Sequence, residues 1–167
     1  MRKMMSLIVL IAIGLGFSGC GGTYHSVSIP TKISKENVYF TAKIEPTLAS
    51  MIAGYSAFNL KIQNNSNKDL EINWNKTYFI QGGQTRGTFM FEGILFIDRN
   101  NPKSPDIVFA NGNYEKTIYP NNYVKFSQGS WLHYGTGLGK QGVYLTVNVD
   151  GKEIKQKIMI DIKQGKK

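Results

Sequence analysis

The chain has few side chains that could carry out chemistry. It contains one cysteine, Cys20, and two histidines, His25 and His133. Cysteine nucleophiles are normally paired with a histidine, and zinc sites combine several Cys or His ligands. The nucleophile elbow Gly-x-Ser-x-Gly does not occur in the sequence. These features predict a protein that is not an enzyme and that has no catalytic residues and no metal centre.

Two further stretches contain ligand-like residues without a convincing pattern. The turn 98–101 and the downstream Asp106 supply the oxygen atoms that Ca²⁺ prefers. Their spacing matches no EF-hand loop, and Arg99 and Lys103 would oppose a cation, so we predict no metal there. The Gly-rich stretch 82–87 does not open a helix and is therefore not expected to bind phosphate.

The candidate binding residues are Trp131, His133 and Tyr134 in the Gly-rich segment 128–142, which we expect to be irregular. Glycine-rich loops at the end of a β-sandwich often carry function. We therefore predict a binding loop here. The alternative is an aromatic cap over the end of the core.

The organisation of the chain around these residues begins with a distinctive N-terminal segment, residues 1–20. Arg2 and Lys3 precede an apolar run from Met4 to Phe17, and Gly19 comes directly before Cys20. A basic head, a short apolar core and small residues at the end are the parts of a secretory signal peptide. The run has about 14 residues, whereas a membrane-spanning helix needs about 20.

With Cys20 at its end, the stretch Phe17-Ser18-Gly19-Cys20 resembles the lipobox of a bacterial lipoprotein. The resemblance implies cleavage between Gly19 and Cys20, and a diacylglycerol thioether and N-acyl chain on Cys20. It implies no other cofactor. Two or more acyl chains anchor a protein stably to a membrane. Gly21 after the cysteine resembles the class sorted to the outer membrane, so we expect a lipid-anchored protein of the cell envelope.

Three parts of the chain follow: a signal peptide over 1–19, a lipidated cysteine and flexible tether over 20–35, and one domain over 36–167. The net charge is +9 and falls to +7 without Arg2 and Lys3. Such a charge favours anionic lipid head groups, anionic glycans or an acidic partner. Nucleic acid is not an expected partner, because the signal directs the chain away from it.

From Asn37 onward, apolar and polar residues alternate, which is typical of half-buried strands. Hairpins are predicted for 58–63 with 70–75, and for 143–149 with 154–162 around Asp150-Gly151. Turn signals recur every 8–12 residues. We predict an all-β chain folded as an immunoglobulin-like antiparallel β-sandwich of eight or nine strands, with a barrel as the alternative.

Residues 58–72, with their Asn-x-Ser turn, resemble the immunoglobulin-like domains of the BsuPI-type proteinase-inhibitor family. This resemblance implies an extracytoplasmic sandwich and suggests inhibition through an end loop. Three functions follow as hypotheses. We favour a non-enzymatic subunit that binds another envelope protein in an accessory or assembly role. The alternatives are a proteinase inhibitor acting through 128–142, and a binder of anionic glycans or lipid head groups.

Overall fold

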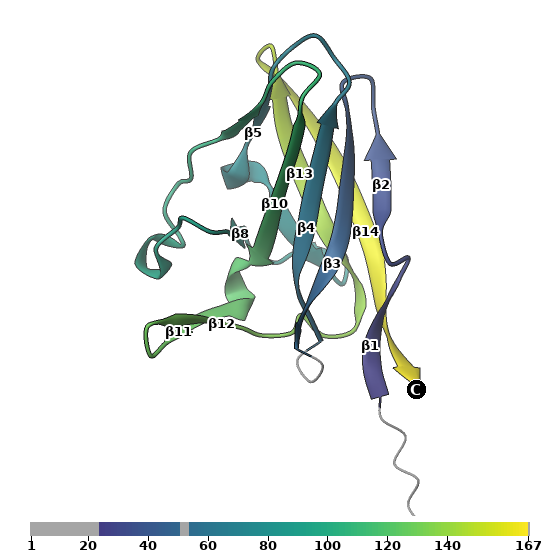
Figure 1. Cartoon of the computed structure of the whole chain (residues 1–167), viewed down its shortest axis with the longest axis vertical. Coiled ribbons are helices and arrows are strands. Elements are labelled where there is room, and N and C mark those ends of the chain that lie inside the picture. Colours follow the sequence, from purple (N-terminus) through teal and green to yellow (C-terminus); the bar gives the residue numbers. More distant parts are fainter. Residues whose placement is uncertain (1–23, 51–53, 167) are drawn as a thin grey trace, which may run out of the picture.

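The computed structural model describes residues 24–50 and 54–166. These residues form fourteen strands and three single turns of 3-10 helix, with no longer helix among them. Twelve of the strands build two antiparallel sheets that face each other, a front sheet of five and a back sheet of seven, and the other two form a separate hairpin (Figure 1). The predicted all-β antiparallel sandwich is confirmed, although the described residues form more strands than the eight or nine expected. The two sheets do not join into one closed cylinder, so the barrel alternative is wrong. No helix in the described ranges is long and apolar enough to cross a bilayer.

The back sheet is built on two long neighbouring strands, β13 (Gly139–Val149) and β14 (Lys152–Lys166). Shorter strands extend it on both sides: β1 (Tyr24–Ile29) on β14, β5 (Leu70–Ile72) and β6 (Tyr78–Gln81) on β13, β9 (Asp106–Val108) on β5, and β7 (Gln84–Thr85) on β6. The β13–β14 hairpin is the one that the sequence predicts. Asp150 and Gly151 have φ angles of 49° and 76°, as a type I′ turn requires.

The front sheet runs in the order β2 (Ile33–Glu36), β3 (Phe40–Ser50), β4 (Gly54–Asn64), β10 (Asn113–Pro120) and β8 (Phe89–Met90). Apolar side chains from both sheets fill the space between them. Among the largest that are fully buried are Phe40, Phe58, Leu60, Ile72, Trp74 and Phe79.

The hairpin predicted for 58–63 with 70–75 is wrong. Strand β4 pairs with β3 and β10 in the front sheet, whereas β5 belongs to the back sheet. The connection is a corner held by buried Asn64, whose side-chain amide donates to the carbonyl oxygens of Val108 at 3.1 Å and Phe109 at 2.9 Å. The alternation of apolar and polar residues shows which side chains face the core. The same alternation occurs whether the next strand lies in the same sheet or in the opposite one, so it could not show that β5 leaves the front sheet.

The flexible tether predicted over 20–35 is too long. Residues 24–29 form β1, which pairs with β14 from Tyr24 opposite Lys166 to Ile29 opposite Asp161. Residues 33–36 form β2 on β3. Both are short edge strands, whose alternation is weak because little of their surface is buried. The signal peptide, the cleavage site at Gly19 and Cys20, and residues 21–23 lie outside the described residues.

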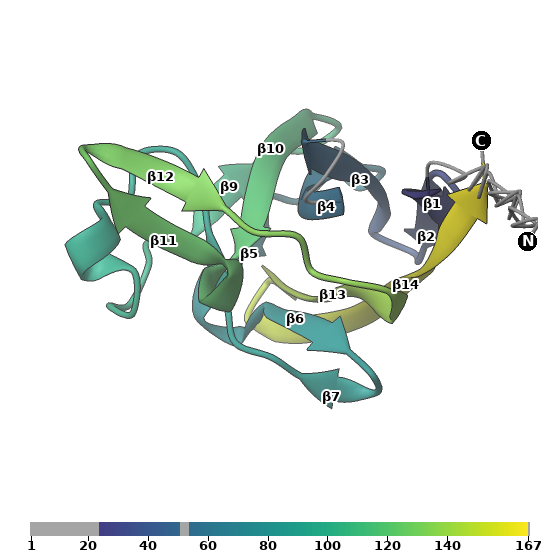
Figure 2. The same ribbon diagram turned by 90° about the horizontal axis from the view of Figure 1, so that it is seen from below.

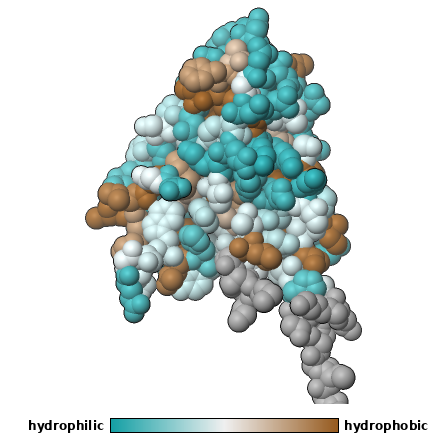
Figure 3. All heavy atoms as spheres, in the orientation of Figure 1, coloured by the Kyte–Doolittle hydropathy of each residue, from teal (hydrophilic) through white to brown (hydrophobic). Residues whose placement is uncertain are grey.

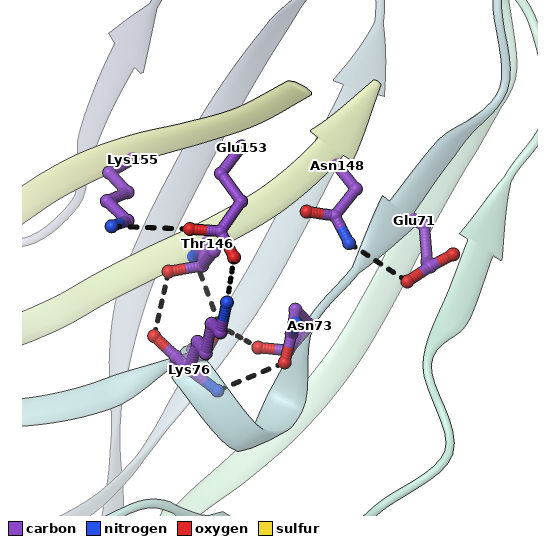
Figure 4. A network of polar contacts seen from close by, with 8 residues as sticks. Glu71, Asn73, Lys76, Thr146, Asn148, Glu153 and Lys155 are labelled. Carbon is purple, nitrogen blue, oxygen red and sulfur yellow. Dashed lines mark hydrogen bonds and ion pairs between the residues drawn. The ribbon is translucent and has the colours of Figure 1, made fainter. Parts of the chain in front are cut away.

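A network of polar contacts joins β13 to the chain between β5 and β6, the two short strands that pair with the same side of β13 (Figure 4). Between β5 and β6, the turn η1 (Trp74–Lys76) lifts the chain away from β13. Thr77 fills the gap: its buried hydroxyl accepts from the backbone N–H of Thr146 at 3.1 Å and donates to the carbonyl of Asn73 at 2.8 Å. The hydroxyl of Thr146 donates to the Lys76 carbonyl at 2.7 Å. The ladder therefore continues through side chains.

Candidate functional site

A two-stranded hairpin lies outside both sheets and projects to one side at one end of the sandwich (Figures 1 and 2). It consists of β11 (Val124–Ser127) and β12 (Ser130–His133). Gln128 and Gly129, with φ angles of 51° and 79°, form its two-residue turn. The segment 128–142 was expected to be irregular, but it contains β12 and the beginning of β13. The many glycines of this segment favoured the prediction of an irregular loop, so the short strand β12 was not predicted.

The inner face of the hairpin packs against the end of β10. Strand register places Phe126 opposite Trp131, and alternation puts His133 on the same face. The ring of Tyr119 stacks on His133 with 4.2 Å between centroids, and meets Trp131 edge to face at 6.2 Å. Two of the three candidate residues thus gather around Tyr119. Tyr134 does not join them: alternation turns it to the outer face, where it is 52% exposed.

His133 packs through the face of its ring, which lies on Tyr119. Burial lowers the pKa of this imidazole below its ordinary value, so the ring is neutral at neutral pH. Its Nε2 is buried and has no hydrogen-bond partner among the described residues. The geometry therefore favours a role for His133 in packing and contact.

A second element faces the hairpin from the side. The turn η2 (Phe96–Asp98) stacks Phe96 on Phe126 with 5.8 Å between ring centroids, and the guanidinium of Arg99 lies 4.3 Å from the centroid of Phe96. Leu95 and Ile97 are 68% and 81% exposed. Figure 3 shows this loop as a hydrophobic projection at the left edge of the molecule.

The connection between β8 and β9, residues 91–105, is here called the η2 loop. Between the η2 loop and the hairpin lies an open cleft of about 440 Å³, here called the end cleft. Its lining residues are apolar or aromatic apart from one arginine: Ile94, Leu95, Phe96, Ile97, Arg99, Phe126 and Trp131. The sequence pointed to Trp131 alone. Leu95 and Ile97 were missed because the run 89–98 resembles a buried strand, and Phe126 was missed because it ends the short, mostly apolar run 123–126, which resembles an ordinary strand. The turn residues on both sides of 94–98 were the available signal that it forms a loop.

Both ends of the η2 loop are fastened to the sandwich by one cluster, here called the loop clamp. At the start of the loop, Phe91 packs on Trp74 with 4.8 Å between ring centroids, and the Lys116 ammonium lies 4.0 Å from the Phe91 centroid. At the end of the loop, Asp106 accepts hydrogen bonds from Trp74 Nε1 at 2.9 Å and from Lys116 Nζ and Tyr114 Oη at 2.5 Å each. The loop is therefore long but held at a fixed position.

The loop clamp also accounts for the charge of Asp106. Burial disfavours the carboxylate and would raise the pKa of Asp106, but the donors on Lys116, Tyr114 and Trp74 outweigh burial and hold this pKa below its ordinary value. Burial and the neighbouring carboxylate raise the pKa of the Tyr114 hydroxyl.

The polar side chains of this region are occupied by one another. Asp98 accepts from the side-chain amide of Asn101 at 2.9 Å, while Asp106 is engaged in the loop clamp. Residues 24–50 and 54–166 contain no group of three or more His, Cys, Asp or Glu side chains arranged to hold a metal ion. What this end of the molecule offers chemically is an apolar contact surface with one arginine at its rim.

No protein-family model matches this chain, and no curated protein matches it either.

Proposed function

We propose that this chain is a lipid-anchored, non-enzymatic protein of the cell envelope that binds another envelope protein as an accessory or assembly subunit. The observation that carries the proposal is the end cleft. Exposed apolar side chains from two elements outside the two sheets converge there. Contiguous exposed apolar surface on a folded domain commonly marks an interaction site.

The make-up of the end cleft suggests what it would bind. Interfaces are enriched in aromatic residues and arginine and depleted in lysine and glutamate at their centres. Phe96, Phe126 and Trp131 supply rigid aromatic walls, and Arg99 Nη1 is already oriented by a hydrogen bond to the Phe96 carbonyl at 3.0 Å. The complementary partner would insert an apolar or aromatic side chain and place a carboxylate near Arg99.

The anchor in this proposal comes from the sequence. The lipobox-like residues before Cys20 support acylation, and the glycine at 21 supports sorting to the outer membrane. Anchoring confines the protein to a surface, which raises its effective concentration near other envelope proteins. A cleft of moderate size is then sufficient for stable association.

The test is a crosslinking pull-down of the full-length protein from its own envelope, comparing Ile97→Ser with Ile107→Ser. Both isoleucines are exposed, at 81% and 46%, but only Ile97 lines the end cleft. Loss of one of the few central contact residues that dominate an interface costs more than about 1 kcal/mol, or roughly fivefold in affinity. We expect one reproducible partner that is depleted with Ile97→Ser and retained with Ile107→Ser. Equal recovery with both variants, or no partner at all, would contradict the proposal.

A further inference from the structure

In a lipid-anchored protein, the position at which β1 begins limits how far the domain can lie from the bilayer. Strand β1 begins at Tyr24, so only four residue steps separate the domain from Cys20. Four residues reach at most about 14 Å, even when fully extended. If Cys20 carries the lipid, as the proposed function holds, the end of the sandwich where β1 starts stays close to the bilayer.

That end of the sandwich is also the end from which the β11–β12 hairpin projects (Figure 1). Strands of eleven residues such as β4 and β13 extend about 35 Å, so the opposite end of the sandwich stands well away from the lipid. Figure 2 looks onto the near end, where the connection from β12 to β13 crosses in front of the sheets and the hairpin lies to one side. The outer face of the hairpin therefore points in the same direction as the anchor.

The side chains on this outer face suit a membrane surface. Lys125 lies opposite Leu132, and both are exposed, as is Tyr134 on the same face. Leu138, in the connection to β13, is 55% exposed. Leucine enters the acyl boundary, tyrosine prefers the head-group level, and lysine is attracted to anionic head groups. The inner face, with Phe126 and Trp131, remains available for the end cleft.

We infer that Lys125, Leu132, Tyr134 and Leu138 form a membrane-contacting surface that rests on the anionic bilayer to which Cys20 is attached. This inference depends on the anchor in the proposed function. It makes the domain stand upright on the membrane rather than swing on a tether. The end cleft then faces sideways, close to the lipid surface, where a membrane-embedded partner could reach it.

The experiment uses the full-length, processed lipoprotein in vesicles of phosphatidylethanolamine and phosphatidylglycerol. With Cys20 acylated, Leu132→Cys offers a single thiol for an environment-sensitive fluorophore, and Val38→Cys is the matched control. Val38 is 84% exposed in the β2–β3 turn at the opposite end of the sandwich. We expect a blue-shifted Leu132→Cys probe that lipid-borne quenchers quench several-fold more strongly than the Val38→Cys probe. Tyr134→Cys repeats the test if Leu132→Cys does not fold.

Vesicle flotation separates failure of this inference from failure of the anchor. Protein that does not float with the vesicles overturns the anchor, and the inference with it. Protein that floats while both probes stay equally accessible to a water-soluble quencher overturns the membrane contact alone. A Leu132→Cys probe shielded in native envelope membranes but open in protein-free vesicles shows that a protein covers this surface, which also overturns the membrane contact.

Discussion

Replacing Asp106 by alanine should weaken the fold and the end cleft together. Asp106 receives three hydrogen bonds from side chains that are buried or half-buried, and it fixes the end of the η2 loop. Each hydrogen bond to a charged group is worth about 1.5–3 kcal/mol, but bonds in one cluster do not add fully. Since 31% of the Asp106 side chain is exposed, water replaces part of the loss. We therefore expect the free energy of unfolding to fall by about 3 kcal/mol.

Urea unfolding followed by tryptophan fluorescence measures this change, because Trp74 lies in the loop clamp. The matched control is Glu115→Ala on β10, the strand that carries Tyr114 and Lys116 of the loop clamp. The Glu115 ion pair with Lys61, at 2.9 Å, is exposed on both sides and should contribute nothing measurable. Recovery of the envelope partner should also fall with Asp106→Ala and not with Glu115→Ala. An Asp106→Ala protein as stable as the control would refute the role of the loop clamp.

The same cluster predicts a pH dependence. The pKa of Asp106 is lower in the folded than in the unfolded chain, so its ionised form stabilises the fold above the unfolded value of about 3.9. This contribution is lost as the pH falls through the lower, folded pKa. Asp106→Asn should flatten the unfolding free energy of the protein in that acidic range. An unchanged acid profile in Asp106→Asn would contradict the assignment.

Two further substitutions test the packing of the back sheet around β13. Thr77→Val removes the hydroxyl that joins Asn73 to Thr146 and leaves a buried N–H unpaired, so stability should fall by about 2 kcal/mol, with exposed Thr85→Val as the control in urea unfolding. Gly142→Ala would place its Cβ 2.0 Å from the Ile158 carbonyl oxygen across the β13–β14 ladder, so we expect a loss of about 3 kcal/mol or failure to fold. Native stability of either variant in thermal unfolding would show that the neighbouring strands adjust.

The β13–β14 hairpin could be predicted from the sequence because its signals are local. Alternating apolar residues specify the inward face of each strand, and Asp150-Gly151 specifies the turn. The turn at 64–69 carries equally good turn residues, yet the strands beside it belong to different sheets. What decides this is the contact of Asn64 with Val108 and Phe109, more than forty residues away. No local pattern reports such a contact.

The candidate site divides in the same way. From the sequence, Trp131, His133 and Tyr134 were expected to act as one loop, but the two-residue period of a strand separates Tyr134 from the other two. The end cleft exists only because Phe96 and Phe126, thirty residues apart, stack on each other.

By itself the sequence determined the class of fold, the absence of a recognisable catalytic set and the expectation of an anchor at Cys20. These depend on residue types and short spacings, which act through local backbone preference and burial. Only the tertiary structure decided which strands pair, how short the tether is, and which apolar side chains remain outside the core. Those properties arise from contacts between residues distant in the chain. Many segments could pack on the same buried surface, and the pairing that forms depends on all of these contacts together.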